Sequence, residues 1–373
     1  MGWWDRWVWS RVANREALTL EQLLAEEGRP TAAGEPVTVE TALRLSTVWG
    51  CVRLLADSVS TLPLHVYRGT DRDPIPTPPL LARPSADFDE LADWLWAVMA
   101  SLLLRGNAWG VITGRSGSTL LPAQVDLVHP DRVAVTTEQG RRVIRIAGTE
   151  YPRAELFHVK AFTWPGELLG LSPIAYAREA IGLGLGAERY GAKLFGDSAI
   201  PSGLLTTDQR ITTGQASDLK ERWNARLKGK RDIAVLGDGA KFQPITIAPE
   251  EAQFIETQRF SVSTICRFYG VPPEMVGGET AGHMAYSSPE MRSTDLLTFT
   301  VRPWLLRVER AVSGLLPRAQ TAKFNAGGFV RATLLDRYQA HKLGIEAGFL
   351  TVNEARELED RPPLPPDQLG GVA

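Results

Sequence analysis

Two long helical patterns in the middle of the chain constrain its fold more than any other feature. The first begins at Ser172-Pro173, an N-cap residue followed by proline at the first helical position, and runs to Gly196. The second begins at Pro249, with two glutamates in its first turn, and runs to Gly270. At 1.5 Å per residue the two helices are roughly 35 Å and 30 Å long. Because a compact segment of about 50 residues joins them, the pattern predicts a helical hairpin that carries a small head.

The segments around the hairpin mix helices with short strands, which is typical of an α+β fold. Turn residues separate most of the apolar runs, and prolines are expected to kink one helix at Pro303 and to end it at Pro317. The predicted helices cover 39–59, 87–106 with a capping box from Asp87 to Glu90, 214–227 in the head, a long helix from 289, 334–348, and a short one capped by Thr351 and Glu354. The predicted strands cover 64–68, 108–113, 124–128, 132–136, 142–147, 156–160, 232–236 and 241–247.

Composition excludes several classes of protein. Lysine and arginine number 41 against 43 acidic residues, and a net charge of -2 argues against a protein whose main task is to grip nucleic acid. The two cysteines, Cys51 and Cys266, cannot form a disulfide framework and indicate a reducing compartment. No stretch reaches the roughly 18–20 continuous apolar residues of a membrane span.

The sequence contains no motif that indicates catalysis. The sequence has no phosphate-binding P-loop, no nucleophile elbow, and no histidine or cysteine pair at metal-ligand spacing. We therefore expect neither an enzyme nor a cofactor or metal site. Gly182, Gly184 and Gly186 lie inside the first long helix, where glycine costs about 1 kcal/mol each, so we expect them to permit close packing against a neighbour.

Three polar or aromatic segments are candidates for contacts with partners. The first nine residues hold four of the 11 tryptophans, and this arm either docks on a partner or packs on its own body. A basic cluster in the head either forms a solvated helix face or contacts nucleic acid or a partner; it comprises Lys220, Arg222, Arg226, Lys228, Lys230 and Arg231. The third is a glycine-rich run after the second long helix, at 277–288.

The order of several short motifs resembles the HK97-type phage portal protein family. Each motif is weak alone, but together they span about 300 residues in the family's order. They are the run Thr41-Ala42-Leu43-Arg44-Leu45-Ser46-Thr47-Val48-Trp49 with Leu62-Pro63-Leu64, Arg105-Gly106-Asn107-Ala108-Trp109, Gly170-Leu171-Ser172-Pro173-Ile174, Pro201-Ser202-Gly203, Phe268-Tyr269-Gly270-Val271-Pro272-Pro273, and Gly348-Phe349-Leu350-Thr351-Val352-Asn353-Glu354-Ala355-Arg356. One departure from the family's pattern is Thr333, which stands where many members have an acidic residue.

The resemblance implies a ring, usually a dodecamer, that forms a DNA channel at the unique vertex of a virion capsid after assembly in the host cytoplasm. Its implied partners are further copies of this chain, the terminase large subunit, the major capsid or scaffold protein, a head-tail adaptor, and double-stranded DNA bound without sequence preference; no membrane is implied. The implied regions are a tryptophan-rich arm and lead-in (1–37), a wing (38–170), a first stem helix (171–199), a clip (200–248), a second stem helix (249–273), a tunnel loop (274–288), a kinked wing helix (289–323), a crown (324–361) and a disordered tail (362–373).

The resemblance also assigns roles to the candidate residues. The basic cluster becomes a docking site on the clip, and the three glycines become packing positions of the stem. The tunnel loop would face DNA through Gly277, Gly278, Glu279, Thr280, Gly282, His283, Met284 and Tyr286. The alternatives are a disordered surface loop without a DNA role, a DNA-processing enzyme of packaging, and a peripheral membrane protein that uses the tryptophan-rich arm.

Overall fold

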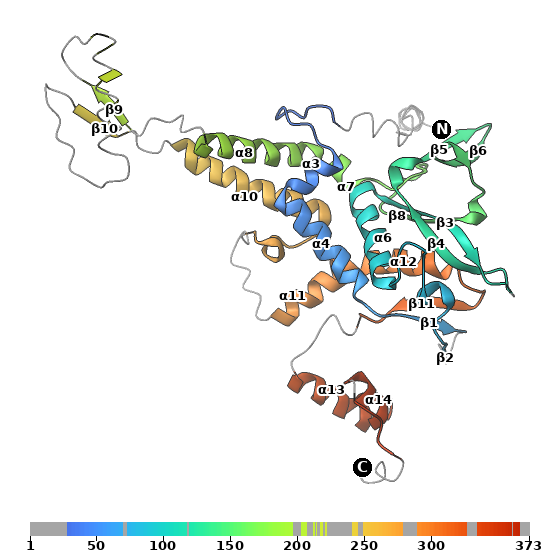
Figure 1. Cartoon of the computed structure of the whole chain (residues 1–373). Coiled ribbons are helices and arrows are strands. Elements are labelled where there is room, and N and C mark those ends of the chain that lie inside the picture. Colours follow the sequence, from blue (N-terminus) through green and yellow to red (C-terminus); the bar gives the residue numbers. More distant parts are fainter. Residues whose placement is uncertain are drawn as a thin grey trace, which may run out of the picture.

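The computed structural model describes residues 28–69, 73–117, 119–196, 203–206, 212, 214, 217–218, 221, 241–244, 249–278, 289–326, 334–359 and 361–365. These residues form an α+β body from which a two-helix hairpin projects, and a small β-ribbon lies beyond the tip of the hairpin (Figure 1). The predicted hairpin is therefore present, and the described part of its head includes this ribbon.

The first predicted helix is divided into two. Helix α3 covers Val39–Arg44 and α4 covers Ser46–Ser60, because Leu45 between them adopts an extended conformation. Thr38 and Thr41 form a capping box at the start of α3. The break lets the buried Leu45 side chain approach the hairpin, so tertiary packing rather than helical spacing decides the local conformation.

Helix α6 (Leu91–Arg105) packs on α4 and forms the centre of the core. The predicted capping box at its start is wrong, since Glu90 is the N-cap residue without a side-chain hydrogen bond. Asp87 belongs instead to a turn in which Ser85 Oγ accepts from the Asp87 amide and donates to Asp126. The predicted end is confirmed, because Gly106 is left-handed with φ 72°.

All six strands predicted before the hairpin are present, in three antiparallel sheets. Strands β3 (Asn107–Arg115), β4 (Pro122–Val128) and β8 (Leu156–Lys160) form one sheet in the order β4-β3-β8. Strands β5 (Val133–Glu138), β6 (Arg141–Ile146) and the short β7 (Thr149–Glu150) form the second. The third joins β1 (Leu64–Arg68) to β2 (Asp73–Pro74) and to β11 (Gln320–Phe324) from the far end of the chain.

Aromatic contacts join the β4-β3-β8 sheet to helix α6. Trp94 of α6 is buried, donates its indole N–H to Val125 O at 3.0 Å, and lies 5.2 Å from the Phe157 ring of β8. Short segments complete the body, namely α5 (Pro79–Ala82) and the 3-10 turns η1 (Pro130–Arg132) and η2 (Arg153–Glu155).

The hairpin consists of α8 (Arg178–Gly196) and α10 (Pro249–Tyr269), which lie side by side in Figure 1 and contact each other along their length. The predicted N-cap Ser172 is confirmed, but the first helix is interrupted at Ala177, which leaves the short α7 (Pro173–Tyr176) ahead of α8. Beyond the tip, β9 (Gly203–Thr206) pairs with β10 (Lys241–Pro244).

Sequence reasoning missed β9 and placed β10 within a longer strand at 241–247. In the predicted head helix at 214–227, the described residues Gly214, Ser217, Asp218 and Glu221 are helical. The predicted strand at 232–236 lies outside the described residues.

The helix that was predicted to kink at Pro303 contains a π-helical turn just before that residue. Helix α11 (Pro289–Asp295) leads into the π-turn η4 (Leu296–Val301), and α12 (Arg302–Ser313) follows with Pro303 in its first turn. Proline has no N–H and its ring crowds the carbonyl one turn earlier, so a widened turn before it relieves the clash. The boundary expected between residues 323 and 324 is wrong, because it cuts through strand β11, whose Phe324 pairs with Leu64.

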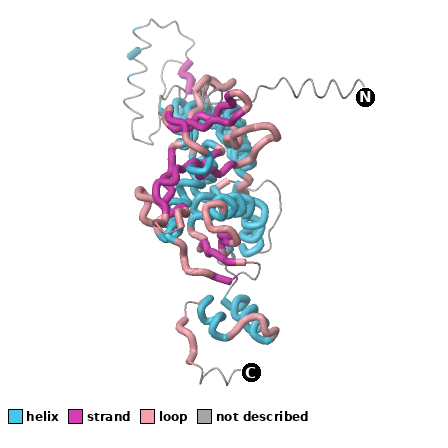
Figure 2. The backbone as a smooth tube through the Cα atoms, turned by 90° about the vertical axis from the view of Figure 1, so that its right-hand side faces the viewer, coloured by secondary structure: helices cyan, strands magenta, loops and turns pink. Residues whose placement is uncertain are grey.

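The C-terminal helices α13 (Leu334–Glu346) and α14 (Val352–Leu358) form a small unit that lies apart from the body in both views of the backbone (Figures 1 and 2). The predicted capping box of Thr351 and Glu354 is confirmed. The expected disordered tail is wrong for its first residues. The Asn353 side chain donates to Leu364 O at 3.2 Å and accepts from the Leu364 amide at 2.8 Å, which fixes this segment on α14.

Candidate functional site

Two of the family-like motifs meet at a joint between the body and the hairpin. Gly106 and Gly170 approach so closely that a Cβ built on Gly170 would lie 2.1 Å from Gly106 O. Asn107 is buried beside them, donates its amide N–H to Gly170 O at 2.9 Å, and accepts from the Gly170 amide at 2.9 Å. Ser172 then donates to Leu104 O at 2.8 Å while it caps α7. The joint therefore sets the direction in which the hairpin leaves the sheet.

His158 completes this joint as a neutral side chain. Its ring stacks on Trp109 at 3.4 Å between ring centroids, and its Nε2 lies 3.1 Å from Asn107 Oδ1. Burial, with the nearby charges of Arg153 and Lys160, lowers the pKa of His158 to about 2. The Asn107 carbonyl oxygen can only accept a hydrogen bond. The single ring proton of the neutral imidazole therefore lies on Nε2, which donates to this oxygen.

The three glycines of the first long helix face residues of the same chain. A Cβ on Gly182 would lie 2.3 Å from Thr31 Oγ1, and one on Gly184 would lie 2.9 Å from Ser261 Oγ and 3.0 Å from Leu45 Cδ2. At Gly186 the corresponding atom would meet Ala33 Cβ at an ordinary 3.6 Å. The expected close packing is thus present at Gly182 and Gly184, but the neighbour is the chain's own lead-in, α10 and Leu45.

The expected lead-in is firmly attached where the structure describes it, at residues 28–37. Arg189 pairs with the buried Glu35 carboxylate at 2.7 Å, and the Ala32 amide donates to Glu179 at 3.0 Å. Arg178 donates to Arg29 O at 2.6 Å and to Pro30 O at 3.1 Å. Residues 28–37 therefore form a strap along α8 rather than a flexible linker.

A pair of thiols lies where α4 crosses α10. Cys51 Sγ donates to Cys266 Sγ at 3.9 Å, and both residues are buried and reduced. The hydrogen bond and the burial raise the pKa of the Cys51 thiol well above its usual range. These side chains act as small apolar contacts of the core.

The second stem-like helix ends in a sharp reversal. Gly270 is left-handed with φ 69°, and Thr300 of the π-turn donates its hydroxyl to Gly270 O at 2.5 Å. Pro272 and Pro273 then open the 3-10 turn η3 (Pro273–Val276), which ends at the left-handed Gly277. The expected tunnel loop therefore begins with an ordered turn packed on α4.

Most residues expected to meet DNA or partners lie outside the described residues. Gly277 and Gly278 of the expected tunnel loop are described, and a Cβ on Gly278 would lie 2.9 Å from Pro273 O. The remaining expected loop residues, Glu279, Thr280, Gly282, His283, Met284 and Tyr286, lie outside the described residues. So do all six residues of the basic cluster, Lys220, Arg222, Arg226, Lys228, Lys230 and Arg231.

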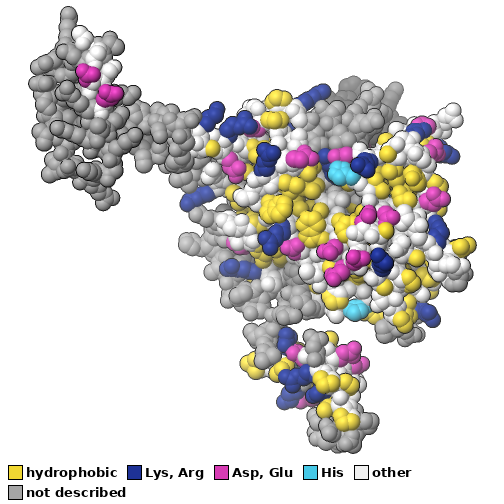
Figure 3. Space-filling model, in the orientation of Figure 1, with side chains coloured by type: hydrophobic (Ala, Val, Ile, Leu, Met, Phe, Trp, Pro, Cys, Tyr) yellow, Lys and Arg dark blue, Asp and Glu magenta, His cyan; other side chains and the backbone are white. Residues whose placement is uncertain are grey.

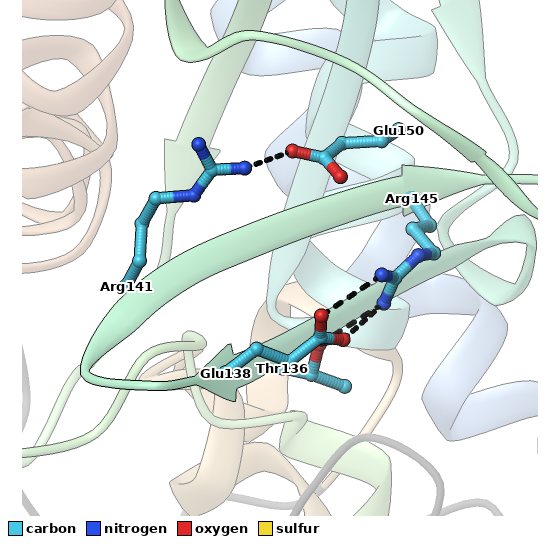
Figure 4. A network of polar contacts seen from close by, with 5 residues as sticks. All are labelled: Thr136, Glu138, Arg141, Arg145 and Glu150. Carbon is cyan, nitrogen blue, oxygen red and sulfur yellow. Dashed lines mark hydrogen bonds and ion pairs between the residues drawn. The ribbon is translucent and has the colours of Figure 1, made fainter.

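The described surface mixes charges of both signs. On the face drawn in Figure 3, lysine and arginine side chains are interspersed with aspartate and glutamate. On the sheet of β5, β6 and β7, Arg145 binds Glu138 through two hydrogen bonds of 2.5 and 3.1 Å, and Arg141 pairs with Glu150 (Figure 4). The hydrogen bonds from Arg145 hold the pKa of Glu138 below its usual value. The carboxylate partners of these two arginines offset their positive charge on this sheet.

Within the described ranges, no cluster of histidine, cysteine and acidic side chains could hold a metal ion. No helix among the described residues is long and apolar enough to cross a membrane. The described residues present an α+β body, a long projecting hairpin and a hydrogen-bonded joint between them.

Comparison with known proteins identifies the class. The family model described as phage portal protein matches residues 46–360. A probable portal protein of Streptomyces phage phiC31 is 33% identical, over 92% of this chain and 80% of its own length. The portal protein of Enterobacteria phage HK97 is 28% identical, over 98% of this chain and 90% of its own. The neck of a native gene transfer agent particle, computed with C12 symmetry, contains a chain with the same fold, with a TM-score of 0.61, 24% identity, and coverage of 93% of this chain and 99% of that one.

The chain therefore belongs to the phage portal protein family. The resemblance found in the motifs is confirmed, and the function that follows is that of a portal, the DNA channel at a capsid vertex. Portal proteins are structural rather than catalytic.

Proposed function

We propose that twelve copies of this chain close into a ring whose axial channel conducts double-stranded DNA into and out of a capsid. The family match over residues 46–360 is the observation that carries this proposal. The C12 symmetry of the similar particle neck supports the number of subunits. In this account a terminase drives DNA through the ring, capsid or scaffold protein surrounds it, and head-tail adaptors attach below.

We infer the roles of the regions from their place in the fold. The α+β body would be the wing, α8 and α10 the stem, the β9–β10 ribbon part of the clip, and α13 with α14 the crown. The Asn107 joint would hold each stem at a fixed angle to its wing. A fixed angle matters because an error repeated in every subunit would prevent a ring from closing.

The charge of the chain supports a role as a conduit rather than a DNA-binding protein. Every phosphate that a ring neutralises adds salt-dependent affinity, and affinity opposes movement. A subunit with a net charge of -2 contributes little of this drag. The loop at 277–288 holds one acid, Glu279, and neither lysine nor arginine, so twelve copies would line the channel with a mostly uncharged collar.

A complementation experiment in the particle that carries this chain tests the proposal. Removing the gene should leave capsids without DNA, and supplying the wild-type chain should restore full genomes. Reversing Arg226, Lys228 and Arg231 to glutamate should leave ring assembly intact and weaken terminase or adaptor attachment. Capsids that package full genomes without the chain would refute the channel role, whereas unchanged packaging and tail joining in the charge-reversed variant would refute only the docking role.

A further inference from the structure

An aromatic groove of about 690 Å³ lies at the base of the hairpin. It is formed by the loop after β8, helix α7, the C-terminal end of α10 and the π-turn. Single exposed apolar side chains are ordinary, but a set of large aromatic ones around one groove marks a binding surface. The exposed fractions of these aromatic residues lie between 46% and 75%, and they are Phe162, Trp164, Tyr176, Phe268 and Phe299.

Two arginines give this groove a preference for further aromatic rings. The Arg307 guanidinium lies 5.3 Å from the ring centroids of both Phe162 and Trp304, and Arg267 lies 5.9 Å from that of Phe260. Burial lowers the pKa of Arg307, which remains charged at neutral pH. Among the described residues no carboxylate pairs with Arg267 or Arg307. Tryptophan is the side chain whose ring binds such a cation best.

The N-terminal segment supplies tryptophans, and the chain enters the described structure at the start of α8, close in sequence to the groove residue Tyr176. Residues 1–9 contain Trp3, Trp4, Trp7 and Trp9. The described chain begins at Gly28, and the carbonyls of the next two residues accept hydrogen bonds from Arg178, which follows the groove residue Tyr176 by two positions. The 18 intervening residues span about 27 Å as a helix and up to about 60 Å when extended, which is enough to reach this groove.

We propose that the tryptophan-rich segment 1–9 of this chain docks in the aromatic groove at the base of the hairpin. The indoles fill the groove and stack on the guanidinium groups of Arg267 and Arg307. The segment is thus an attachment between parts of the portal rather than a membrane anchor.

Photo-crosslinking of the full chain tests this proposal. Benzoylphenylalanine in place of Phe162 should cross-link to residues 1–9, and mass spectrometry should recover the tryptic peptides that end at Arg6 or Arg11. Phe349 is the matched control, because it is 78% exposed and lies in the C-terminal unit. The same substitution there should give no such peptide. Cross-links from position 162 only to other segments, or equal yields from both positions, would overturn the proposal.

Limited trypsin digestion provides a second, independent readout. Docking should protect the bond after Arg6, so Phe162→Asp should speed cleavage there at least tenfold, while Phe349→Asp should leave it unchanged. Both positions are exposed, so neither substitution should disturb the fold. Trp9→Ala should match Phe162→Asp, since it removes an indole from the other side of the same contact and leaves both residues of the Arg6–Trp7 bond unchanged. Equal cleavage rates in all four proteins would refute docking.

Discussion

The strap along α8 leads to a prediction about two glycine-to-alanine substitutions in that helix. The same change should affect stability differently at Gly182 and at Gly186. Replacing glycine by alanine inside a helix stabilises it by about 1 kcal/mol through the backbone. At Gly186 the added methyl would meet Ala33 at 3.6 Å, an ordinary contact distance. Gly186→Ala should therefore stabilise the protein by about 1 kcal/mol. At Gly182 the methyl would lie 2.3 Å from Thr31 Oγ1, which is buried and bonded to Glu35 O at 2.9 Å. Overpacking of this kind costs about 1–3 kcal/mol.

The stabilisation of the helix backbone is common to both variants. The difference between their stabilities therefore isolates the cost of overpacking at Gly182. Gly182→Ala should be about 1–3 kcal/mol less stable than Gly186→Ala, which is a ratio of about 5- to 150-fold in local opening. Hydrogen exchange measures it at the strap amides of Thr31 and Gly34, which donate to Glu35 O at 2.9 Å and to Thr31 O at 2.8 Å. Equal protection in the two variants, or greater protection in Gly182→Ala, would refute the close approach of strap and helix.

The other predictions concern the hairpin, the joint and the core. Gly184→Leu should destabilise the α8–α10 contact within one subunit by about 1–3 kcal/mol, and faster hydrogen exchange in α10 should report it. Asn107→Ala should cost at least about 3 kcal/mol in thermal unfolding, because it leaves both backbone groups of Gly170 buried without partners. The folded pKa of His158 lies below the unfolded value, so stability should fall by about 2 kcal/mol between pH 7 and pH 5, and His158→Gln should remove this loss. The Cys51 thiol should react with a disulfide reagent at pH 8 only when the chain unfolds, since its pKa is raised; rapid reaction of the native protein would contradict this.

The elements that the sequence predicted best are those specified by local signals. Ser172 with proline caps a helix, Gly106 ends one, and Thr351 with Glu354 starts one, because each satisfies its own backbone groups within a single turn. The alternating strands before the hairpin were found for the same reason, since their side-chain period is visible in the sequence.

The elements that were missed depend on residues distant in the sequence. Leu45 breaks a continuous helical pattern because its side chain packs near Gly184. Strand β11 alternates over only four residues, from Thr321 to Phe324, and it forms because β1 offers an unpaired edge. The role of Asn107 was likewise invisible, since its partners lie 51 and 63 positions away. The motif that contains Asn107 resembled a family pattern. The hydrogen bonds between Asn107 and Gly170 give the physical reason for an asparagine at this position.

The most direct test of the central claim is the quaternary structure of the purified full chain by electron cryomicroscopy. We expect closed rings of the 40.9 kDa subunit with an open axial channel, twelvefold symmetry, and α8 and α10 packed around the axis. Particles that remain monomeric, or that form open filaments without a channel, at concentrations where the chain is fully folded would contradict it.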